Sequence, residues 1–392
     1  MYKKWYYVCL IFVFVSCSHD IAHIKNAGKG KLKANYQLVK IEEKKFQLDS
    51  ETAPRPVYTQ MFKDKSGTEL FTFFNSYNKS IYIYDYLSST YIRSIHYDNE
   101  GANGILHPIG YYIKNMDSIF VYDMMKIEVA LTDSSGFVRD RISLRNSSDN
   151  NWALYYPQYS LSTVNPFIER QGRLILTGFA PFAIPSENID NFLFTAYIDL
   201  KTKQIEYHHK YPKALYGCNY NWEGGFATMV YPCLSHDEKL IFSFPVSHDL
   251  FFYDFKSENL TKLYAGSNFA NTIHSIDHEQ RRTPNELIME NYMQEDMYGA
   301  ILYDPYRKMY YRFLLQGMPD AAIGMSTGEK PVDIIIMDEN FNYLGETTIG
   351  VEKEWNWTNS FVTLEGLNIE YTSGEGIDED YLTFKIFIPK VI

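Results

Sequence analysis

Positive charge, cysteine and long hydrophobic runs are all scarce in this sequence. Its 392 residues contain 37 Lys and Arg against 48 Asp and Glu, which gives a formal net charge of −11 at pH 7. This balance argues against a general nucleic-acid binder. The apolar run at the N-terminus, Trp5–Val15, has eleven residues, whereas a helix needs roughly 20 to span a bilayer. The run is therefore too short to be a transmembrane helix.

Aromatic side chains, in contrast, are abundant. Phe, Trp and Tyr make up 17% of the residues, more than a helical bundle uses, and aromatic enrichment favours strands. With 45% apolar and 22% charged residues, the chain can bury a core and is not intrinsically disordered. The length fits two or three ordinary domains or one large β domain, and the aromatic content favours the β domain.

The N-terminus has the pattern of an export signal. Lys3 and Lys4 precede the apolar run, which matches the charged and hydrophobic regions of such signals. The run ends in Phe14-Val15-Ser16-Cys17, which resembles a bacterial lipobox, where cleavage leaves an acylated cysteine as the new N-terminus. We predict a lipoprotein signal peptide over residues 1–16 and a lipid anchor on Cys17. The alternative is an ordinary secretion signal with an unrelated cysteine, since Phe14 stands where leucine is commonest.

Residues 17–33 are predicted to form a flexible tether. They contain Gly28, Gly30 and four lysines with almost no apolar periodicity, and the lysines would favour anionic headgroups. Lipoproteins of the Bacteroides type that reach the cell surface often carry an acidic run after the cysteine, whereas Ser18–Ile21 supplies one acid. We expect an outer-membrane lipoprotein of the cell envelope, on the periplasmic face in preference to the cell surface.

Two cysteines, Cys218 and Cys233, would remain in the mature protein besides the acylated one. An oxidising envelope permits a disulfide between them. The predicted strands place Cys218 in a loop and Cys233 near the far end of a strand. An eight-residue strand spans about 26 Å, whereas a disulfide tolerates roughly 6 Å between Cα atoms. We therefore favour two buried thiols over a bridge.

A strand that ends in an acidic turn recurs along the chain. The five copies are Ser80–Asp85, Glu128–Asp133, Phe194–Asp199, Leu250–Asp254 and Asp333–Asp338. A few turn residues follow each copy, and another strand then begins. We interpret the aspartate as structural, because its carboxylate can accept backbone N–H bonds two residues later and so close a hairpin.

Each repeat also has two strands before the acidic turn, which makes four-stranded units typical of a β-propeller. In the fifth unit, the predicted strands are Tyr298–Tyr303, Met309–Leu315, Val332–Met337 and Tyr343–Ile349. The five units lie near 56–97, 104–144, 155–212, 223–267 and 296–350.

The C-terminal piece supplies only two predicted strands, Phe361–Tyr371 and Tyr381–Pro389. The segment Tyr36–Leu48 is available to complete this sixth sheet and tie the two ends of the chain together. We predict an all-β protein, a six-bladed β-propeller that forms a single domain over residues 34–392, with its last blade closed by N-terminal strands. A pair of β-sandwiches or another β domain is the alternative.

Nearly the whole mature chain resembles an uncharacterised family of Bacteroides-type lipoproteins, a domain of unknown function numbered 4221. The motifs that carry the resemblance are the lipobox, Asn75–Asp85, Ile301–Pro305 with Tyr310–Phe313, and Phe341–Glu346. The resemblance implies a six-bladed propeller. It brings no established activity, so it does not settle function.

No catalytic or cofactor motif is evident, and we expect no cofactor and no metal. A glycine-rich phosphate loop and a Gly-x-Ser-x-Gly elbow are both missing. His274 and His278 stand four apart, but their segment predicts no convincing helix and offers no third zinc ligand. His208 and His209 are adjacent on a predicted outer strand, so they should point to opposite faces. Carboxylates could line a central channel, although sequence alone does not pair them.

Three Asn-Trp pairs give the best functional lead. Asn151-Trp152, Asn221-Trp222 and Asn356-Trp357 each precede an aromatic residue by the same spacing. If all three enter first strands, they lie on one face, where Trp152, Trp222 and Trp357 with Tyr220 and Trp355 could bind a partner or stack on a sugar. The alternative is that each Trp is a wedge packed between blades. The long connector Phe269–Met297, with a short helix from Asn285, enters the fifth unit on the same face.

We therefore expect a lipid-anchored propeller of the cell envelope that acts as a non-catalytic protein- or glycan-binding module. Its expected partners are the membrane, through the anchor, and an envelope protein or glycan, but not a nucleic acid. The alternatives are an enzyme that processes a polysaccharide or peptide with channel carboxylates, and a structural subunit of an envelope complex.

Overall fold

The structure is a computed structural model that describes residues 22–52, 56–145, 157–181, 184, 189–217, 220–277, 283–321, 324–372 and 379–392. The predicted signal peptide and Cys17 lie outside this range, as do Trp152, Cys218 and His278. Among the described residues, no helix is both long enough and apolar enough to cross a membrane.

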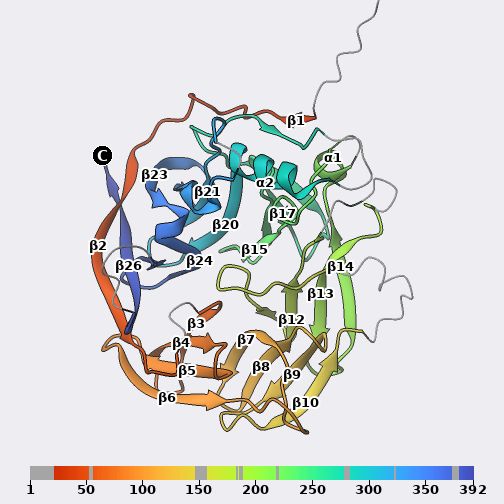
Figure 1. Ribbon diagram of the computed structural model, residues 1–392, viewed down its shortest axis with the longest axis vertical. Coiled ribbons are helices and arrows are strands. Elements are labelled where there is room, and N and C mark those ends of the chain that lie inside the picture. The colour runs from red at the N-terminus through yellow and green to blue at the C-terminus, as the bar shows by residue number, and fades with distance from the viewer. Residues whose placement is uncertain are drawn as a thin grey trace, which may run out of the picture.

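The described strands form six four-stranded antiparallel sheets (Figure 1). Sheet one contains β3 (Thr59–Lys63), β4 (Glu69–Asn75), β5 (Ser80–Asp85) and β6 (Thr90–His96). Sheet two contains β7 (Pro108–Asn115), β8 (Ser118–Asp123), β9 (Glu128–Thr132) and β10 (Val138–Ser143). Sheet three contains β11 (Ile168–Arg170), β12 (Arg173–Thr177), β13 (Leu193–Asp199) and β14 (Ile205–Lys210).

The other three sheets repeat this plan. Sheet four contains β15 (Tyr231–Leu234), β16 (Leu240–Ser243), β17 (Asp249–Tyr253) and β18 (Leu260–Tyr264). Sheet five contains β20 (Met297–Asp304), β21 (Met309–Leu315), β22 (Pro331–Asp338) and β23 (Tyr343–Val351). Sheet six contains β24 (Trp355–Val362), β25 (Leu367–Tyr371), β26 (Tyr381–Val391) and β2 (Tyr36–Gln47).

The sheets are the blades of a six-bladed β-propeller, as predicted, and each of the five predicted units contains one blade (Figure 1). The N-terminal strand β2 is the outer strand of blade six and pairs with β26. The predicted composition of this blade was wrong in one respect. Phe361–Tyr371 is not one strand but parts of β24 and β25, which are joined by a tight turn in which the Thr363 and Gly366 backbones exchange hydrogen bonds.

The acidic turns have the structural role that the repeat predicted. The carboxylates of Asp133, Asp199, Asp254 and Asp338 each accept a hydrogen bond from the backbone N–H two residues later, over 2.7–3.0 Å. Asp85 instead uses the N–H of Ser88, three residues later, at 2.8 Å. Bonds from the Ser135 hydroxyl and backbone lower the pKa of Asp133 to about 2. These carboxylates are therefore engaged in closing hairpins.

The segment 22–33 is not a free tether, contrary to the prediction. Its strand β1 (His23–Ile24) pairs with β19 (Ile273–His274) of the connector between blades four and five. Asn26 Nδ2 donates hydrogen bonds to the carbonyls of Ser267 and Ala270, both at 2.8 Å. Apolar periodicity is missing here because backbone and amide hydrogen bonds hold the segment in place of an apolar face.

Helical structure is confined to connections. The helix α1 (Lys213–Tyr216) precedes blade four, and α2 (Asn285–Gln294) lies where the short helix was predicted in the connector before blade five. The single-turn helices η2 (Thr327–Glu329) and η3 (Glu352–Glu354) flank the strands β22 and β23. In Figure 1, α1 and α2 lie near each other, on the side of the ring where β1 is found.

Candidate functional site

The structure places the three described tryptophans of the candidate site inside the fold. Trp222, Trp355 and Trp357 expose only 2%, 6% and 5% of their surface. The Trp222 indole donates to the carbonyl of Leu215 at 2.7 Å, and the Trp355 indole donates to that of Ile349 at 3.0 Å. These rings are therefore not available to a ligand in this structure, which corrects the expectation that they form an exposed binding surface.

Trp357 packs as a wedge between blades, whereas the Trp355 ring contacts Tyr371 and Phe387 of its own blade six. The Trp357 ring lies 5.6 Å from Tyr231 of blade four and 5.7 Å from Phe313 of blade five, measured between ring centroids. A Cβ at Gly299 would come within 2.9 Å of the same indole. Trp355 and Trp357 belong to β24 itself, not to the connection that enters it. The Trp357 ring thus fills space between two sheets.

Tyr220 is the one described member of the predicted set that is partly exposed. Its ring stacks on Trp222 with centroids 5.5 Å apart, and its hydroxyl donates to the carbonyl of His23 at 3.2 Å. It therefore joins the N-terminal segment to the connection before blade four. Trp152 lies outside the described residues, so its placement stays a prediction.

The centre of the ring is filled by the segment 157–167, which leads into blade three. Val164 donates its backbone N–H to the carbonyl of Thr358 of blade six, at 3.3 Å. Blades three and six are opposite in a ring of six, so the segment crosses the axis. Tyr159, Leu161 and Val164 are buried. Apolar side chains therefore stand where the alternative interpretation had placed channel carboxylates.

Glu370 of β25, which is 1% exposed, lies near this plug, because Asn359 contacts both Glu370 and Thr163 of the segment. Its carboxylate accepts hydrogen bonds from Asn356 Nδ2 at 2.7 Å and Asn359 Nδ2 at 2.6 Å. Both asparagines belong to β24, so the carboxylate holds together two strands of blade six. The hydrogen bonds of the Glu370 carboxylate thus indicate a structural role within blade six.

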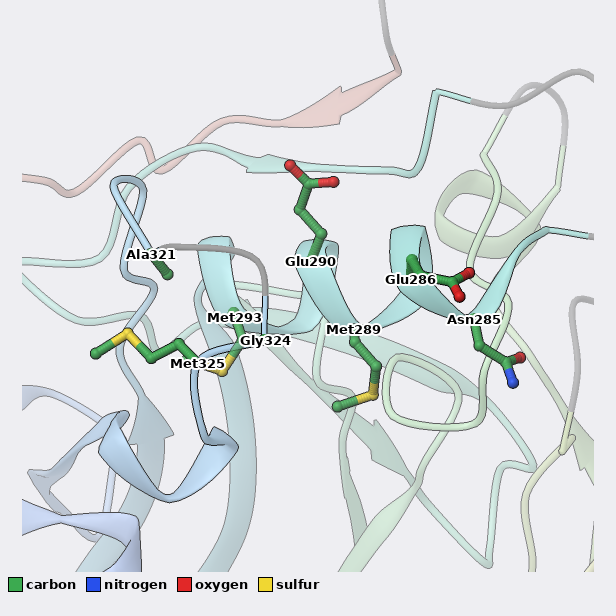
Figure 2. A pocket seen from close by; sticks show the side chains of 8 residues that line it. All are labelled: Asn285, Glu286, Met289, Glu290, Met293, Ala321, Gly324 and Met325. Atoms are coloured by element: carbon green, nitrogen blue, oxygen red, sulfur yellow. The ribbon is translucent and has the colours of Figure 1, made fainter.

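A cleft of about 340 Å³ opens instead beside α2, between this helix and the connection from β21 to β22 (Figure 2). Its apolar lining includes Met289 and Met293 from α2 and Met325 from the connection. Figure 2 shows Met289 and Met325 projecting from these two walls. Met289 and Met325 are each 38% exposed. Methionine side chains are flexible and polarisable, and they adapt to varied apolar partners.

Acidic side chains border this cleft. Glu286 and Glu290 from α2 belong to its lining, together with Asn285. Figure 2 shows Glu290 extending from the helix on the side away from Met289. The cleft thus combines an apolar floor with a negative border, and it offers no cationic side chain among its described lining residues. Such a surface matches an apolar segment with basic neighbours.

The helix α2 is fixed to blade five by a buried lysine. Lys330 Nζ donates hydrogen bonds to the carbonyls of Tyr292 and Glu295, the latter at 2.7 Å. It also lies 4.5 Å from the centroid of the Tyr292 ring. Burial lowers the pKa of Lys330 to about 8. Because these two carbonyls are at the end of α2, the lysine complements the negative end of the helix dipole.

Three carboxylates fix the connector that leads into α2. Glu346 accepts the backbone N–H of Asn268 at 3.0 Å, Asp296 that of Asn271 at 2.5 Å, and Glu295 that of His274 at 2.8 Å. The three donors are spaced three residues apart. Burial raises the pKa of Glu346 and Glu295. The connector is therefore a well-supported element on which the cleft can be built.

A second cleft of about 470 Å³ lies between blades three and four. Its lining includes Phe194, His209, Phe242 and Tyr253. The His209 ring lies 4.3 Å from that of Tyr253, and burial lowers the pKa of His209 to about 3. His209 Nδ1 and Thr195 Oγ1 are 2.7 Å apart, so this histidine is part of the packing between the blades.

The expected orientation of the two adjacent histidines was wrong. The rings of His208 and His209 both approach Tyr197, at 4.5 Å and 5.7 Å between centroids. His209 has a φ of 59° and is skipped in the register between β13 and β14. This left-handed backbone conformation interrupts the extended strand, and with it the strict alternation of side chains on which the prediction relied.

The remaining candidate metal ligands are His274 and His278, of which the structure describes only His274. His274 lies in β19, and its Nδ1 is 3.2 Å from the carboxylate of Glu295. Its proposed partner His278 lies outside the described residues. In the part of the chain that is described, no three His, Cys, Asp or Glu side chains are grouped so that they could hold a metal ion. Cys233 of β15 is a free thiol, and burial raises its pKa to about 12.

Sequence reasoning found the connector and its helix but not the cleft. Met289 and Met293 show four-residue spacing, but their partner Met325 is contributed by a connection that follows two further strands. The three carboxylates were also missed, because Glu346 is 78 residues from the N–H that it binds. A long connector between two regular blades was the one usable signal.

The fold is a six-bladed propeller with a cleft between the connector helix α2 and the connection from β21 to β22. The family profile of "Domain of unknown function (DUF4221)" matches residues 35–348, and the chain belongs to this family. A crystal structure of a DUF4221 family member from Bacteroides vulgatus is similar over 91% of this chain and 99% of that one, with 20% identity and a TM-score of 0.78.

A second similar structure is that of a protein inferred to be exported, from Bacteroides fragilis. It covers 91% of this chain and 95% of that one, with 11% identity and a TM-score of 0.53. At these identities the likeness concerns the fold. No curated protein matches the sequence.

Proposed function

We propose that this protein is a lipid-anchored, non-catalytic binding module of the cell envelope, and that it docks a protein partner in the cleft beside α2. The anchor rests on the lipobox that ends in Cys17 and on the export signal before it. A structurally similar protein is inferred to be exported, which fits an envelope location. The outer membrane, on its periplasmic face, remains the preferred site.

The observation that carries the binding role is the methionine-lined cleft with an acidic border. Met289 and Met325 each expose 38% of their surface, although apolar side chains of this size are normally buried. The helix α2 is held in place at its C-terminal end by Lys330 and by the contact of Glu295 with His274, and just before its N-terminal end by the hydrogen bond from the Thr283 N–H to Glu223 at 2.8 Å. A preformed apolar groove lowers the entropic cost of binding a peptide.

The partner segment is expected to carry apolar anchors next to Lys or Arg. The apolar anchors would fill the space between Met289 and Met325, while Glu286 and Glu290 attract the basic side chains. A glycan is less well matched, because Trp222, Trp355 and Trp357 are buried and the described lining of this cleft has no aromatic ring.

A selection from a displayed library of random peptides tests this function. The chain from Ser18 to Ile392 should enrich sequences that combine apolar and basic residues. Met289→Glu should reduce the affinity of a selected peptide at least tenfold, because a charge would enter the apolar floor. A double variant with Glu286→Lys and Glu290→Lys should bind the selected basic peptides with lower affinity, because like charges would face each other.

The matched control is Tyr77→Glu, at a side chain that is 78% exposed in blade one, and it should bind the peptides as the unaltered protein does. Enrichment of acidic peptides, or equal loss of binding in Tyr77→Glu, would contradict the proposal. Binding of a glycan that Met289→Glu does not weaken would also contradict it.

The anchor is tested separately in cells. Cys17→Ala should release the protein from membranes, and the unaltered protein should carry acyl chains detectable by mass spectrometry. A protein that stays unprocessed in the membrane and lacks acyl chains would exclude the lipoprotein assignment.

A further inference from the structure

The segment 22–33 is a fixed part of the propeller rim. Besides the pairing of β1 with β19, Gly30 donates its N–H to the carbonyl of Asn268 at 3.0 Å, and Leu32 donates its N–H to the Asn268 side chain at 3.0 Å. Figure 1 shows the segment running along the outside of the ring from β2 to β1. Its position is therefore defined relative to blades four and five.

One glycine shows how close this contact is. A Cβ at Gly28 would lie within 2.1–2.7 Å of the Tyr264 ring and hydroxyl. Tyr264 belongs to β18, the outer strand of blade four, and its hydroxyl donates to Asn26 Oδ1 at 2.7 Å. Only glycine permits this approach, so the segment lies directly on the rim of blade four.

The segment presents four exposed lysines, Lys25, Lys29, Lys31 and Lys33, which we name the basic strip. Two of them make hydrogen bonds with neutral groups: Lys29 with the Asn271 side chain, and Lys31 with the carbonyl of Ala27 at 2.8 Å. Among the described residues, none of the four is ion-paired with a carboxylate. No acidic residue occurs in the sequence between Asp20 and Glu42.

This strip stands out because the chain as a whole is acidic, with a net charge of −11. Several other exposed lysines are paired with carboxylates, such as Lys63 with Glu69 at 3.1 Å and Lys262 with Asp249 at 2.7 Å. Four exposed cations within nine residues, none of them paired with a carboxylate of the described part of the chain, form a surface that attracts anions.

The strip is also close to the proposed anchor. Ala22, whose carbonyl accepts the N–H of Ser275 at 2.9 Å, is five residues after Cys17. An extended chain of that length spans at most about 18 Å. Headgroups around the anchored cysteine are therefore within reach of the strip, and a membrane surface attracts basic side chains that come within a Debye length.

We propose that the basic strip is a docking surface for the anionic lipid headgroups of the membrane that holds the anchor. This inference rests on the lipid anchoring set out under the proposed function, and it adds a defined orientation. The rim of blades four and five faces the membrane, and both faces of the ring, including the cleft beside α2, stay accessible to partners.

Vesicle sedimentation tests the strip without the anchor. The probe is vesicles of phosphatidylcholine, with or without phosphatidylglycerol, and the protein is the chain from Ser18 to Ile392 without acyl groups. We expect binding to phosphatidylglycerol vesicles that weakens at high salt. Replacing the four lysines of the strip by Gln should weaken it at least tenfold, since each lysine near an anionic surface contributes about fivefold.

The control replaces four other exposed lysines, Lys63, Lys65, Lys201 and Lys256, by Gln. It makes the same change in net charge and should retain vesicle binding. Equal losses in the two variants, binding to phosphatidylcholine alone, or tighter binding to an acidic polypeptide than to the vesicles would overturn the proposal. Failure of acylation at Cys17, or of peptide binding in the cleft, leaves this assay unaffected, so the two proposals fail separately.

Discussion

Thr163, in the segment that leads into blade three, donates a hydrogen bond from its hydroxyl to the side-chain carbonyl of Asn359 in the opposite blade six, 2.6 Å away. The Thr163 hydroxyl also accepts the backbone N–H of Thr59 of blade one, at 2.8 Å. Three blades thus meet at one side chain near the axis. The propeller is closed at its centre as well as at its rim, where β2 completes blade six.

We predict that Asn359→Ala destabilises the protein by about 2–4 kcal/mol, because a buried carboxylate and a buried carbonyl would both lose a donor. Asn359 is fully buried, and its Nδ2 donates to Glu370 at 2.6 Å and to the carbonyl of Pro56 at 2.5 Å. Urea denaturation measures the change in the free energy of unfolding. Asn340→Ala, in an exposed turn, is the control and should change it little. Equal stability of Asn359→Ala and the unaltered protein would contradict this account of the centre.

The blades could be predicted from sequence because their signals are local. The aspartate of each acidic turn binds N–H groups two or three residues away, so the repeat is visible in short windows. The hairpin between β24 and β25 was missed because its turn is marked by a single glycine, Gly366, in a stretch where apolar and polar residues continue to alternate on both sides. Gly366 has a φ of 154°, which favours glycine.

The functional surfaces could not be predicted in the same way, because their contacts join distant parts of the chain. Asn26 is 241 residues from Ser267, whose carbonyl it binds. Because this contact is not visible in the local sequence, segment 22–33 was predicted to be a flexible tether. The tryptophans were correctly seen as repeated, but repetition does not distinguish an exposed ring from a wedge. The burial of a ring distinguishes a wedge from an exposed binding residue, and burial depends on side chains of the neighbouring blade.

Stability should fall as the pH falls below about 6.5, in part because of His209. Burial lowers the pKa of this histidine to about 3 in the folded protein, whereas an unfolded chain has a histidine pKa near 6.5. Between these values the unfolded state binds the extra proton. The free energy of unfolding therefore decreases by up to about 1.4 kcal/mol per pH unit from this group.

Comparison with His209→Leu isolates this contribution. Buried carboxyls such as Glu346, whose pKa is raised, act with the opposite sign, because the folded state then binds the proton more readily. They are the same in both proteins and cancel in the difference. Between about pH 6 and pH 4, the free energy of unfolding of the variant should fall less steeply with decreasing pH, by a slope equivalent to up to one bound proton. Urea denaturation measures this free energy, with the value at pH 8 as the baseline. Parallel curves would exclude the assignment.

The Cys233 thiol should react slowly in the folded protein. Burial raises its pKa from 9.0 to about 12, so the fraction present as thiolate falls about a thousandfold at pH 8. In a Cys218→Ser background, iodoacetamide should alkylate Cys233 orders of magnitude more slowly in buffer than in denaturant, as followed by mass spectrometry. Similar rates in the two conditions would show that the thiol is accessible.

The packing of the central plug predicts a rescue between Gly110 and Leu161. Gly110 lies in β7 of blade two, and a Cβ there would come within 2.6 Å of Leu161 Cβ and 3.2 Å of the Tyr58 ring. Gly110→Ala should therefore destabilise the protein by about 1–3 kcal/mol through overpacking. Leu161→Ala alone should cost about 2–5 kcal/mol, because Leu161 is buried and a cavity would remain.

The double variant distinguishes a packed plug from a loosely placed segment. Shortening Leu161 removes the Cδ1 atom that would lie 3.0 Å from the new methyl group and leaves space into which the backbone can relax. The combined loss of stability should thus be smaller than the sum of the two single losses by about 1 kcal/mol or more. Additive losses in urea denaturation would mean that segment 157–167 does not press on blade two at Gly110.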